Sequence, residues 1–177
     1  MSHLIRRFEE RDRNAMARFA GALPDHDLLF LGRDLRHPRV VEAWLDAIAE
    51  GSIDSFVAED GGEIAGTAAL VRDPLGWSSH VGEVRLLVSA DRRGAGLGRD
   101  LLETVFAVAR ERGLAKLTAR MTPDQTGAVQ LFESLGFRGE AMLRDHVQDR
   151  AGNRFDLAVL SYDAGRASAR HEAYGLQ

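Results

Sequence analysis

A glycine-rich segment flanked by arginines has the residue types that point most directly to chemistry. It covers Arg93–Gly98, with Arg92 before it and Arg99 after it. Its glycines stand at the beginning of an expected helix, where each costs about 1 kcal/mol against alanine. Such glycines are expected where a ligand must approach the backbone closely. The first turn of a helix also has unpaired N–H groups and roughly half a positive charge. Together with the arginines, the segment predicts an anion site that suits a diphosphate.

A purely structural interpretation of the same segment also stands, in which the glycines tighten a turn and the arginines are solvated. Two other phosphate motifs are excluded. The glycines alternate as G-x-G-x-G and lack the G-x-G-x-x-G spacing of dinucleotide folds. The next strand has Lys116 and Arg120 where a ribose-binding acid would be sought. The P-loop pattern G-x-x-x-x-G-K-S/T is absent from the sequence.

Alternating strand-like and helix-like segments position this turn. Strands are expected at His3–Phe8, Ile53–Glu59, Glu63–Val71, Val81–Ser89, Leu114–Met121, Phe137–Val147 and Asn153–Tyr162. Helices are expected where apolar residues recur at helical spacing: Met16–Leu23, Pro38–Gly51, Leu97–Ala109 and Ala128–Leu135. Thr122, Pro123 and Gln125 resemble a capping box that begins the last of these helices. The order is β-α-α-β-β-β-α-β-α-β-β, which predicts an α/β (α+β) fold with a mixed sheet.

The length and composition are those of one globular domain. The chain has 177 residues, of which 45% are hydrophobic and 28% charged, so a disordered chain is not expected. We expect a single domain at residues 1–163, followed by a polar tail at residues 164–177. No apolar stretch approaches the roughly 20 residues needed to cross a bilayer, and no signal peptide is evident. A cytoplasmic location is therefore expected.

Charge and cysteine content exclude several classes of function. The formal net charge of -4 and the isoelectric point of about 5.9 give no global basic field for nucleic acid or an anionic membrane. The absence of cysteine excludes disulfides, cysteinyl zinc sites and a cysteine nucleophile. The histidines do not have metal-ligand spacing. No metal, nucleic-acid or membrane partner is expected.

Two motifs in register make the chain similar to the GNAT acyltransferase superfamily. The acyl-CoA turn of that family follows the pattern Gln/Arg-x-x-Gly-x-Gly/Ala, which Arg93, Gly96 and Gly98 match. Its second signature is a Leu-Tyr-Glu-x-Leu-Gly-Phe-like run, and Leu131–Phe137 matches it except at the tyrosine. The order of the elements also agrees with that of the family from His3 to Tyr162. The resemblance implies a mostly antiparallel sheet of about seven strands flanked by about four helices.

The resemblance implies acetyl-CoA as the co-substrate, bound where the strand before the turn separates from the strand after the long helix. Its pantetheine is expected along the backbone of Leu86, Leu87 and Val88. Its diphosphate is expected on the N–H groups of the turn, namely Arg93, Gly94, Ala95, Gly96, Leu97, Gly98 and Arg99. The expected cofactor-binding set also includes Gln125 and Phe132, where the family often has asparagine and tyrosine.

Glu83 is the candidate catalytic base, because family members often use a glutamate on this strand and it is the only carboxylate on Val81–Ser89. Strand alternation places it on the face opposite Val84, with Arg85 beside it. A bulge could re-aim it toward the other face. A surface glutamate paired with an arginine is the alternative. In that case a water chain or a loop residue such as His146 is the base.

Phe132 departs from the family pattern. A tyrosine commonly protonates the leaving thiolate there, and a phenyl ring cannot donate a proton. A thiol has a pKa near 8.5, so its thiolate leaves tolerably well without that acid. Tyr162 is not expected to substitute, because an antiparallel last strand carries it away from the cleft.

Three functions stay open at this point. The leading hypothesis is transfer of an acetyl group to a primary amine of a small molecule or an amino-acid-like substrate. The alternatives are acetylation of a protein N-terminus or lysine, and a catalytically silent acyl-CoA-binding module. Asp25, Asp27 and Asp34, in the loop after the first helix, could attract a cationic amine. A homodimer is expected through the terminal hairpin (Phe137–Tyr162), since many relatives pair through their last strands.

Overall fold

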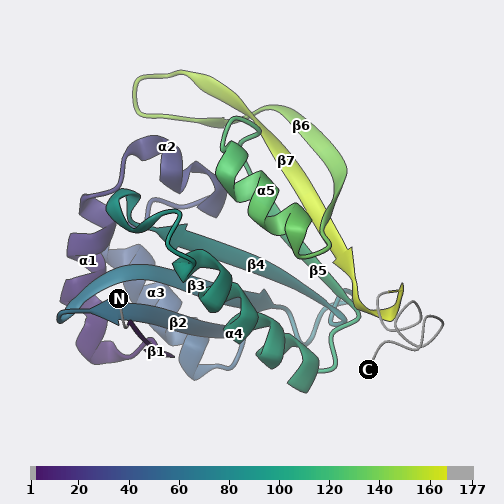
Figure 1. Ribbon diagram of the computed structural model, residues 1–177, viewed down its shortest axis with the longest axis horizontal. Helices are drawn as coiled ribbons and strands as arrows, with labels where there is room; N and C mark the ends of the chain where they lie inside the picture. The colour runs from purple at the N-terminus through teal and green to yellow at the C-terminus, as the bar shows by residue number, and fades with distance from the viewer. Residues whose placement is uncertain (1–2, 167–177) are drawn as a thin grey trace.

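The computed structural model describes residues 3–166, which form one seven-stranded sheet with helices on both faces (Figure 1). The strands, in the spatial order β1-β2-β3-β4-β5-β7-β6, are β1 Leu4–Arg7, β2 Ile53–Asp60, β3 Glu63–Arg72, β4 Val81–Val88, β5 Lys116–Met121, β7 Arg154–Asp163 and β6 Arg138–Gln148. The α-helices are α1 Arg13–Gly21, α2 Asp25–Leu28, α3 Pro38–Ala49, α4 Leu97–Glu111 and α5 Thr126–Ser134. Short 3-10 turns are η1 Glu10–Asp12, η2 Leu29–Leu31 and η3 Ala90–Arg92. The predicted fold class is confirmed.

One parallel strand pair opens the middle of the sheet. β4 and β5 are parallel, whereas the other neighbouring strands are antiparallel. β4 pairs with β3 up to Val88, opposite Gly66. With β5 it pairs only up to Val84, opposite Ala119. Among residues 3–166, no strand therefore pairs with the second edge of β4 at 85–88, and this is the separation that the family resemblance implies.

Two apolar cores lie on opposite faces of the sheet. α4 and α5 cover the face turned toward the viewer in Figure 1, and α3 lies behind the sheet. α4 presents fully buried Leu101, Leu102 and Val105 to the first core, because these residues share one side of the helix. The second core contains Met16 and Trp44 from α1 and α3. The glycine-rich turn is thereby fixed at the end of β4, above the first core.

The beginning of α5 differs from the prediction. A capping box at Thr122 was expected, but α5 begins at Thr126 and Gln125 is its N-cap residue, with φ -75° and ψ 64°. The Gln125 N–H donates instead to the Thr122 carbonyl, at 3.0 Å, which closes a turn. The hydroxyl of Thr122 is buried and lies 3.1 Å from Nε2 of His26. A tertiary contact has replaced the local cap, so this prediction was wrong.

Two further differences concern short segments. The one-turn α2, which follows Pro24, was not predicted, because four residues give too little periodicity to recognise. The expected polar tail, 164–177, lies mostly outside the described residues. The remaining strand ends agree with the predictions to within one or two residues.

Candidate functional site

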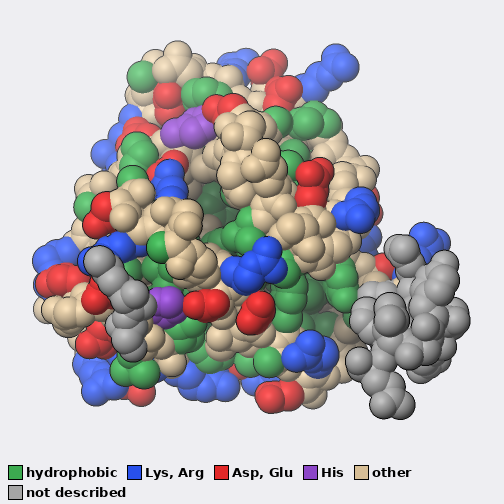
Figure 2. Space-filling model, in the orientation of Figure 1, with side chains coloured by type: hydrophobic (Ala, Val, Ile, Leu, Met, Phe, Trp, Pro, Cys, Tyr) green, Lys and Arg blue, Asp and Glu red, His purple; other side chains and the backbone are tan. Residues whose placement is uncertain are grey.

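A cleft of about 540 Å³ lies between α4 and α5, over the separated ends of β4 and β5. Figure 2 shows it as a hollow with hydrophobic side chains at its base. Its lining residues are Asp27, Phe30, Val84, Leu86, Val88, Arg93, Gly94, Gly96, Gly98, Arg99, Arg120, Met121, Gln125, Thr126, Gly127, Ala128, Leu131 and Phe132. The glycine-rich turn and the open edge of β4 therefore border the same space.

Two glycines of the turn have different structural roles. Gly96 is the N-cap residue of α4 and has φ 87°, in the left-handed region that disfavours other residues. Within the described part of the chain, no side-chain hydrogen bond caps this helix end. Gly98 is needed for a different reason: a Cβ there would lie 3.2 Å from Leu131 and 3.4 Å from Leu86. The uncapped N–H groups of α4 therefore face the cleft at a place where the backbone can be approached closely.

The arginines of the turn are tied to neighbouring elements. Arg93 donates from Nη2 to Asp27 at 2.5 Å and from Nε to the Val88 carbonyl at 3.2 Å. Asp27 lies on α2 and its side chain is only 12% exposed. Arg99 donates to the Ser134 hydroxyl at the end of α5, at 3.1 Å. The turn is thus joined to both walls of the cleft, and Arg93 is paired with α2 although half of its side chain is exposed.

The cleft brings together most of the residues expected to bind the cofactor. Those that line it are Leu86, Val88, Arg93, Gly94, Gly96, Gly98, Arg99, Gln125 and Phe132. Leu87, Ala95 and Leu97 do not. The Leu87 side chain is buried in the core beside α1 and α3, and Leu97 is buried beneath α4. The contacts expected of these residues are made by backbone atoms, so the expectation for them stays a prediction.

Glu83 lies on the sheet face opposite Val84, as strand alternation predicts. The register between β3 and β4 runs without a shift from Gly82 to Val88, so the bulge considered for this strand does not occur. Glu83 accepts from Nε of Arg85 at 2.7 Å, and its other oxygen lies 3.4 Å from Nε of Arg120. Its side chain is 20% exposed. Glu83 itself does not line the cleft, but Arg120 lines it and connects the carboxylate to it.

Comparison with known proteins agrees with this geometry. The sequence model of the acetyltransferase (GNAT) family matches residues 22–137, well over half of the chain. The chain belongs to the GNAT family. It is 38% identical over 92 residues to N-acetyltransferase 8 of Rattus norvegicus, and 38% identical over 85 residues to that of Mus musculus. These matches cover 50% and 47% of this chain but only 41% and 37% of the relatives.

Solved structures show the same fold. An N-acetyltransferase from Staphylococcus aureus Mu50 has a TM-score of 0.79 at 21% identity, over 92% of this chain and 99% of that one. A putative acetyltransferase from Salmonella typhimurium, solved with its cofactor acetyl-CoA, has a TM-score of 0.76 at 22% identity, over 92% and 94% of the two chains. A ribosomal-protein-alanine N-acetyltransferase from Brucella melitensis has a TM-score of 0.75 at 25% identity, over 90% and 99%.

The tyrosine position of the GNAT signature is a packed phenyl ring in this chain. Phe132 lines the cleft but is only 3% exposed, and its ring meets Phe137 edge to face at 5.1 Å. Tyr162 stacks on Phe106 at 6.1 Å and does not line the cleft. Within the described residues, the cleft therefore has no tyrosine hydroxyl that could protonate a leaving group.

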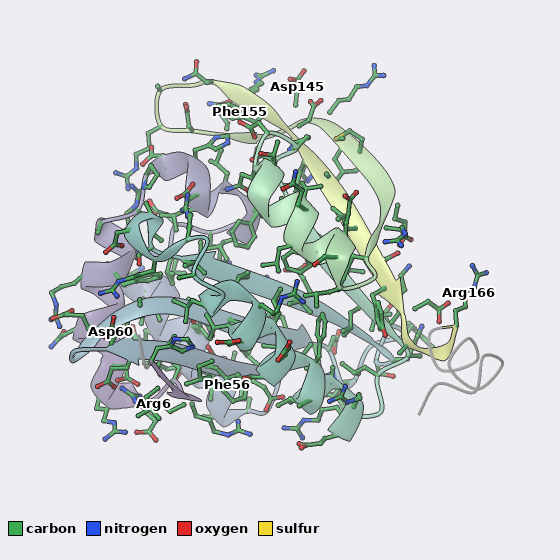
Figure 3. The ribbon with its side chains drawn as sticks, viewed as in Figure 1. Arg6, Phe56, Asp60, Asp145, Phe155 and Arg166 are labelled. Atoms are coloured by element: carbon green, nitrogen blue, oxygen red, sulfur yellow. The ribbon has the colours of Figure 1, made fainter. Side chains whose placement is uncertain are left out.

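Sequence reasoning gave α2 too small a role, because its contacts are tertiary. α2 contacts the glycine-rich turn through Asp27 and the segment after β5 through His26. Nε2 of His26 lies 2.9 Å from Asp124, and its ring meets Phe155 of β7 at 4.8 Å, near the top of Figure 3. Burial raises the pKa of Asp124, but hydrogen bonds from Thr122 and His26 outweigh it and hold that pKa below its ordinary value. α2 therefore forms one wall of the GNAT cleft.

The acidic residues expected to attract an amine are instead paired with arginines. Arg36 donates to Asp25 at 2.5 Å and to Asp34 at 2.8 Å. Arg150, in the turn between β6 and β7, donates to Asp34 at 2.6 Å. Hydrogen bonds from Arg36 and then Arg150 hold the pKa of Asp34 well below its usual range. These carboxylates join the loop after α2 to the terminal hairpin, and the structure gives them a positional role.

The described part of the chain has neither a metal-ligand cluster nor a membrane-spanning helix. No group of three or more His, Cys, Asp or Glu residues within residues 3–166 is placed to hold a metal ion. None of the helices described there combines the length and the apolar character that crossing a bilayer requires.

Proposed function

We propose that the protein transfers an acetyl group from acetyl-CoA to a primary amine of a small molecule or an amino-acid-like substrate. The observation that carries the proposal is the unpaired edge of β4 at residues 85–88, which leads to the uncapped N-terminus of α4. An extended chain can add to an open strand edge through backbone hydrogen bonds. The amides of pantetheine suit that edge, and a diphosphate suits the helix terminus beyond it.

The residues of the turn fit this co-substrate. The N–H groups of Arg93–Arg99 would hold the diphosphate, with Arg99 adding positive charge at the cleft wall. Pantetheine would lie along the backbone of Leu86–Val88, between the apolar side chains of α4 and α5. Phe132 and Gln125 would border it from the α5 side.

The reaction requires an unprotonated amine and a route for one further proton. The amine nitrogen attacks the thioester carbonyl carbon, an N–C bond forms, the C–S bond breaks, and CoA leaves as its thiolate. A backbone N–H of β4 would stabilise the oxyanion that develops. Glu83 would take a proton from the incoming ammonium through water, and the proton released after attack ends on the CoA sulfur. Because the thiol pKa is near 8.5, this departure does not need an acid in place of Phe132.

Two alternatives are supported by specific observations. Acetylation of a protein N-terminus is supported by the similarity to the Brucella melitensis structure described as a ribosomal-protein-alanine N-acetyltransferase. A silent acyl-CoA-binding module is supported by the absence of an acid at Phe132. The leading proposal also includes a cytoplasmic location, a homodimer and no nucleic-acid partner.

The test is release of free CoA thiol from acetyl-CoA by the purified protein. It is offered a pool of small primary amines in one reaction and short peptides with free N-termini in another. Thiol release above background hydrolysis with the small amines supports the proposal, whereas release with peptides alone supports the first alternative. Binding of acetyl-CoA in calorimetry without thiol release in either reaction would identify the silent module.

A further inference from the structure

Of the residues that the structure describes, three arginines line the cleft, and a diphosphate explains only two of them. Arg93 and Arg99 belong to the turn beyond β4. Arg120 lies on β5, one residue past Ala119, where the pairing of β4 and β5 ends. The separated stretch of β4 between that point and the turn has four residues, which span about 13 Å in an extended strand. Arg120 therefore lies at the other end of the cleft, where the thioester is expected.

The guanidinium of Arg120 has donors to spare. Its side chain is 45% exposed. Among residues 3–166 it makes one ion pair, in which its Nε lies 3.4 Å from a Glu83 carboxylate oxygen. A guanidinium has five N–H donors in a fixed fork. Arg93, by comparison, is engaged by both Asp27 and the Val88 carbonyl. The terminal nitrogens of Arg120 are thus available to an anion that enters this end of the cleft.

The surroundings of Arg120 combine opposite charges with apolar walls. Arg85 and Arg120 contact different oxygens of the Glu83 carboxylate, at 2.7 Å and 3.4 Å. This group has two positive charges and one negative charge at the point where the strands separate. Phe30 and Met121 line the adjacent cleft. A ligand with an amine and a carboxylate close together matches such a site better than a simple amine does.

We propose that Arg120 recognises a carboxylate of the acceptor, and that the acceptor is a free α-amino acid or a close analogue. This inference rests on the proposed N-acetyltransferase function. Arginine binds carboxylates through two parallel N–H···O bonds, which fixes their orientation as well as their position. With the carboxylate on Arg120, the ammonium group one carbon away lies next to Glu83, which attracts it. A peptide N-terminus has an amide in place of that carboxylate and does not satisfy the guanidinium.

The first experiment compares acceptors on the wild-type protein. Free L-amino acids and the carboxamides of the same amino acids are offered separately with acetyl-CoA, and kcat/KM is measured from thiol release. We expect kcat/KM to be roughly 10- to 100-fold higher for the free acids, because one hydrogen-bonded contact between charged groups contributes a factor of this size. Equal or better turnover of the carboxamides would overturn the assignment of Arg120 while leaving N-acetyltransferase activity established. Absence of thiol release with every acceptor would instead overturn the proposed function, and this inference with it.

The second experiment removes the guanidinium. Arg120→Gln should raise KM for free amino acids by roughly 10- to 100-fold. The loss for carboxamides should be much smaller, because they lack the carboxylate, and acetyl-CoA affinity in calorimetry should stay the same. Arg120→Lys should recover part of the loss, because it restores the charge without the fork. Arg154→Gln, on β7 and outside the cleft lining, is the matched control and should behave as wild type. An equal loss for acids and carboxamides would show that Arg120 only positions Glu83, and would contradict the proposal.

Discussion

At the scale of single residues, the role of Glu83 depends on its neighbours. It is held by Arg85 and Arg120 on the sheet face away from α4. This geometry is compatible with two roles for Glu83. It could be a base that acts on an amine arriving from that face, or a surface carboxylate held in ion pairs. Kinetics separates these interpretations, because only a base affects the chemical step.

If Glu83 is the base, Glu83→Gln should lower the turnover number by roughly 10²- to 10⁴-fold and leave acetyl-CoA affinity nearly intact. Proton removal concerns the attacking amine, whereas the cofactor is held by the backbone. Raising the pH should restore part of the activity, since more of the amine then arrives deprotonated. Glu103→Gln, exposed on α4, is the control. Near-normal turnover of Glu83→Gln at neutral pH would show that Glu83 is a surface carboxylate and that another group is the base.

A substitution at Gly96 tests whether the turn binds the diphosphate of the cofactor. Gly96→Asp adds a side chain and a negative charge where the diphosphate is expected, so the thermal shift produced by CoA should vanish. The substitution also strains the backbone at φ 87°, and Gly152→Asp is the matched control because Gly152 has φ 86° in the turn between β6 and β7. Both variants should lose similar stability, and only Gly96→Asp should lose the CoA response. A preserved shift in Gly96→Asp would exclude the turn as the diphosphate site.

At the scale of elements, one buried carboxylate joins four of them. Asp54 on β2 lies beside Arg7 of β1, Arg72 of β3 and Arg112 at the end of α4, at 3.3, 3.5 and 2.9 Å. Its side chain is only 4% exposed. Burial raises the pKa of Asp54, but contacts with Arg112 and the other arginines outweigh it and keep that pKa below its ordinary value. This cluster fixes α4, and with it the turn, against the sheet.

Asp54→Asn should lower the free energy of unfolding by about 2–4 kcal/mol at neutral pH, because it leaves arginines around a neutral group. The folded-state pKa is depressed, so the charge of Asp54 stabilises the protein above the unfolded-state value of about 4. That stabilisation is lost as the pH falls toward the folded-state pKa. Urea unfolding should therefore show the difference between variant and wild type narrowing below about pH 4. Asp46→Asn, exposed on α3, should differ little from wild type at any pH.

At the scale of the whole molecule, β6 is an edge strand whose residues are mostly exposed. Its register against β7 is interrupted twice, and Asp145, labelled in Figure 3, has φ 48° within the second interruption. Bulges and charged residues on an edge strand hinder uncontrolled pairing with other chains. An exposed Met142 nevertheless leaves an apolar contact available on this strand.

We expect a homodimer that forms through the terminal hairpin. Light scattering at micromolar concentration should give twice the mass of the chain, and Met142→Glu should shift the protein toward monomer. Leu75→Glu is the control, because Leu75 is also an exposed apolar residue, in the loop between β3 and β4 and outside the hairpin. A wild-type monomer would refute the dimer, and equal effects of the two substitutions would place its interface elsewhere.

The sequence by itself determined the order of the longer elements, because their apolar spacing is a local property, and two motifs in register indicated the GNAT fold. Apolar spacing along α4 predicts its buried side, and the glycines and arginines of the turn predict an anion site at the beginning of that helix. Only the tertiary structure decided that Arg120 lies beside Glu83 and that Asp27 holds Arg93, since strands and loops distant in the chain make those contacts. Thr122 shows how a tertiary contact can outweigh a local preference. Its local sequence favours a helix cap, but burial beside His26 gives its hydroxyl a different partner, and a buried polar group takes the partner that the folded chain provides.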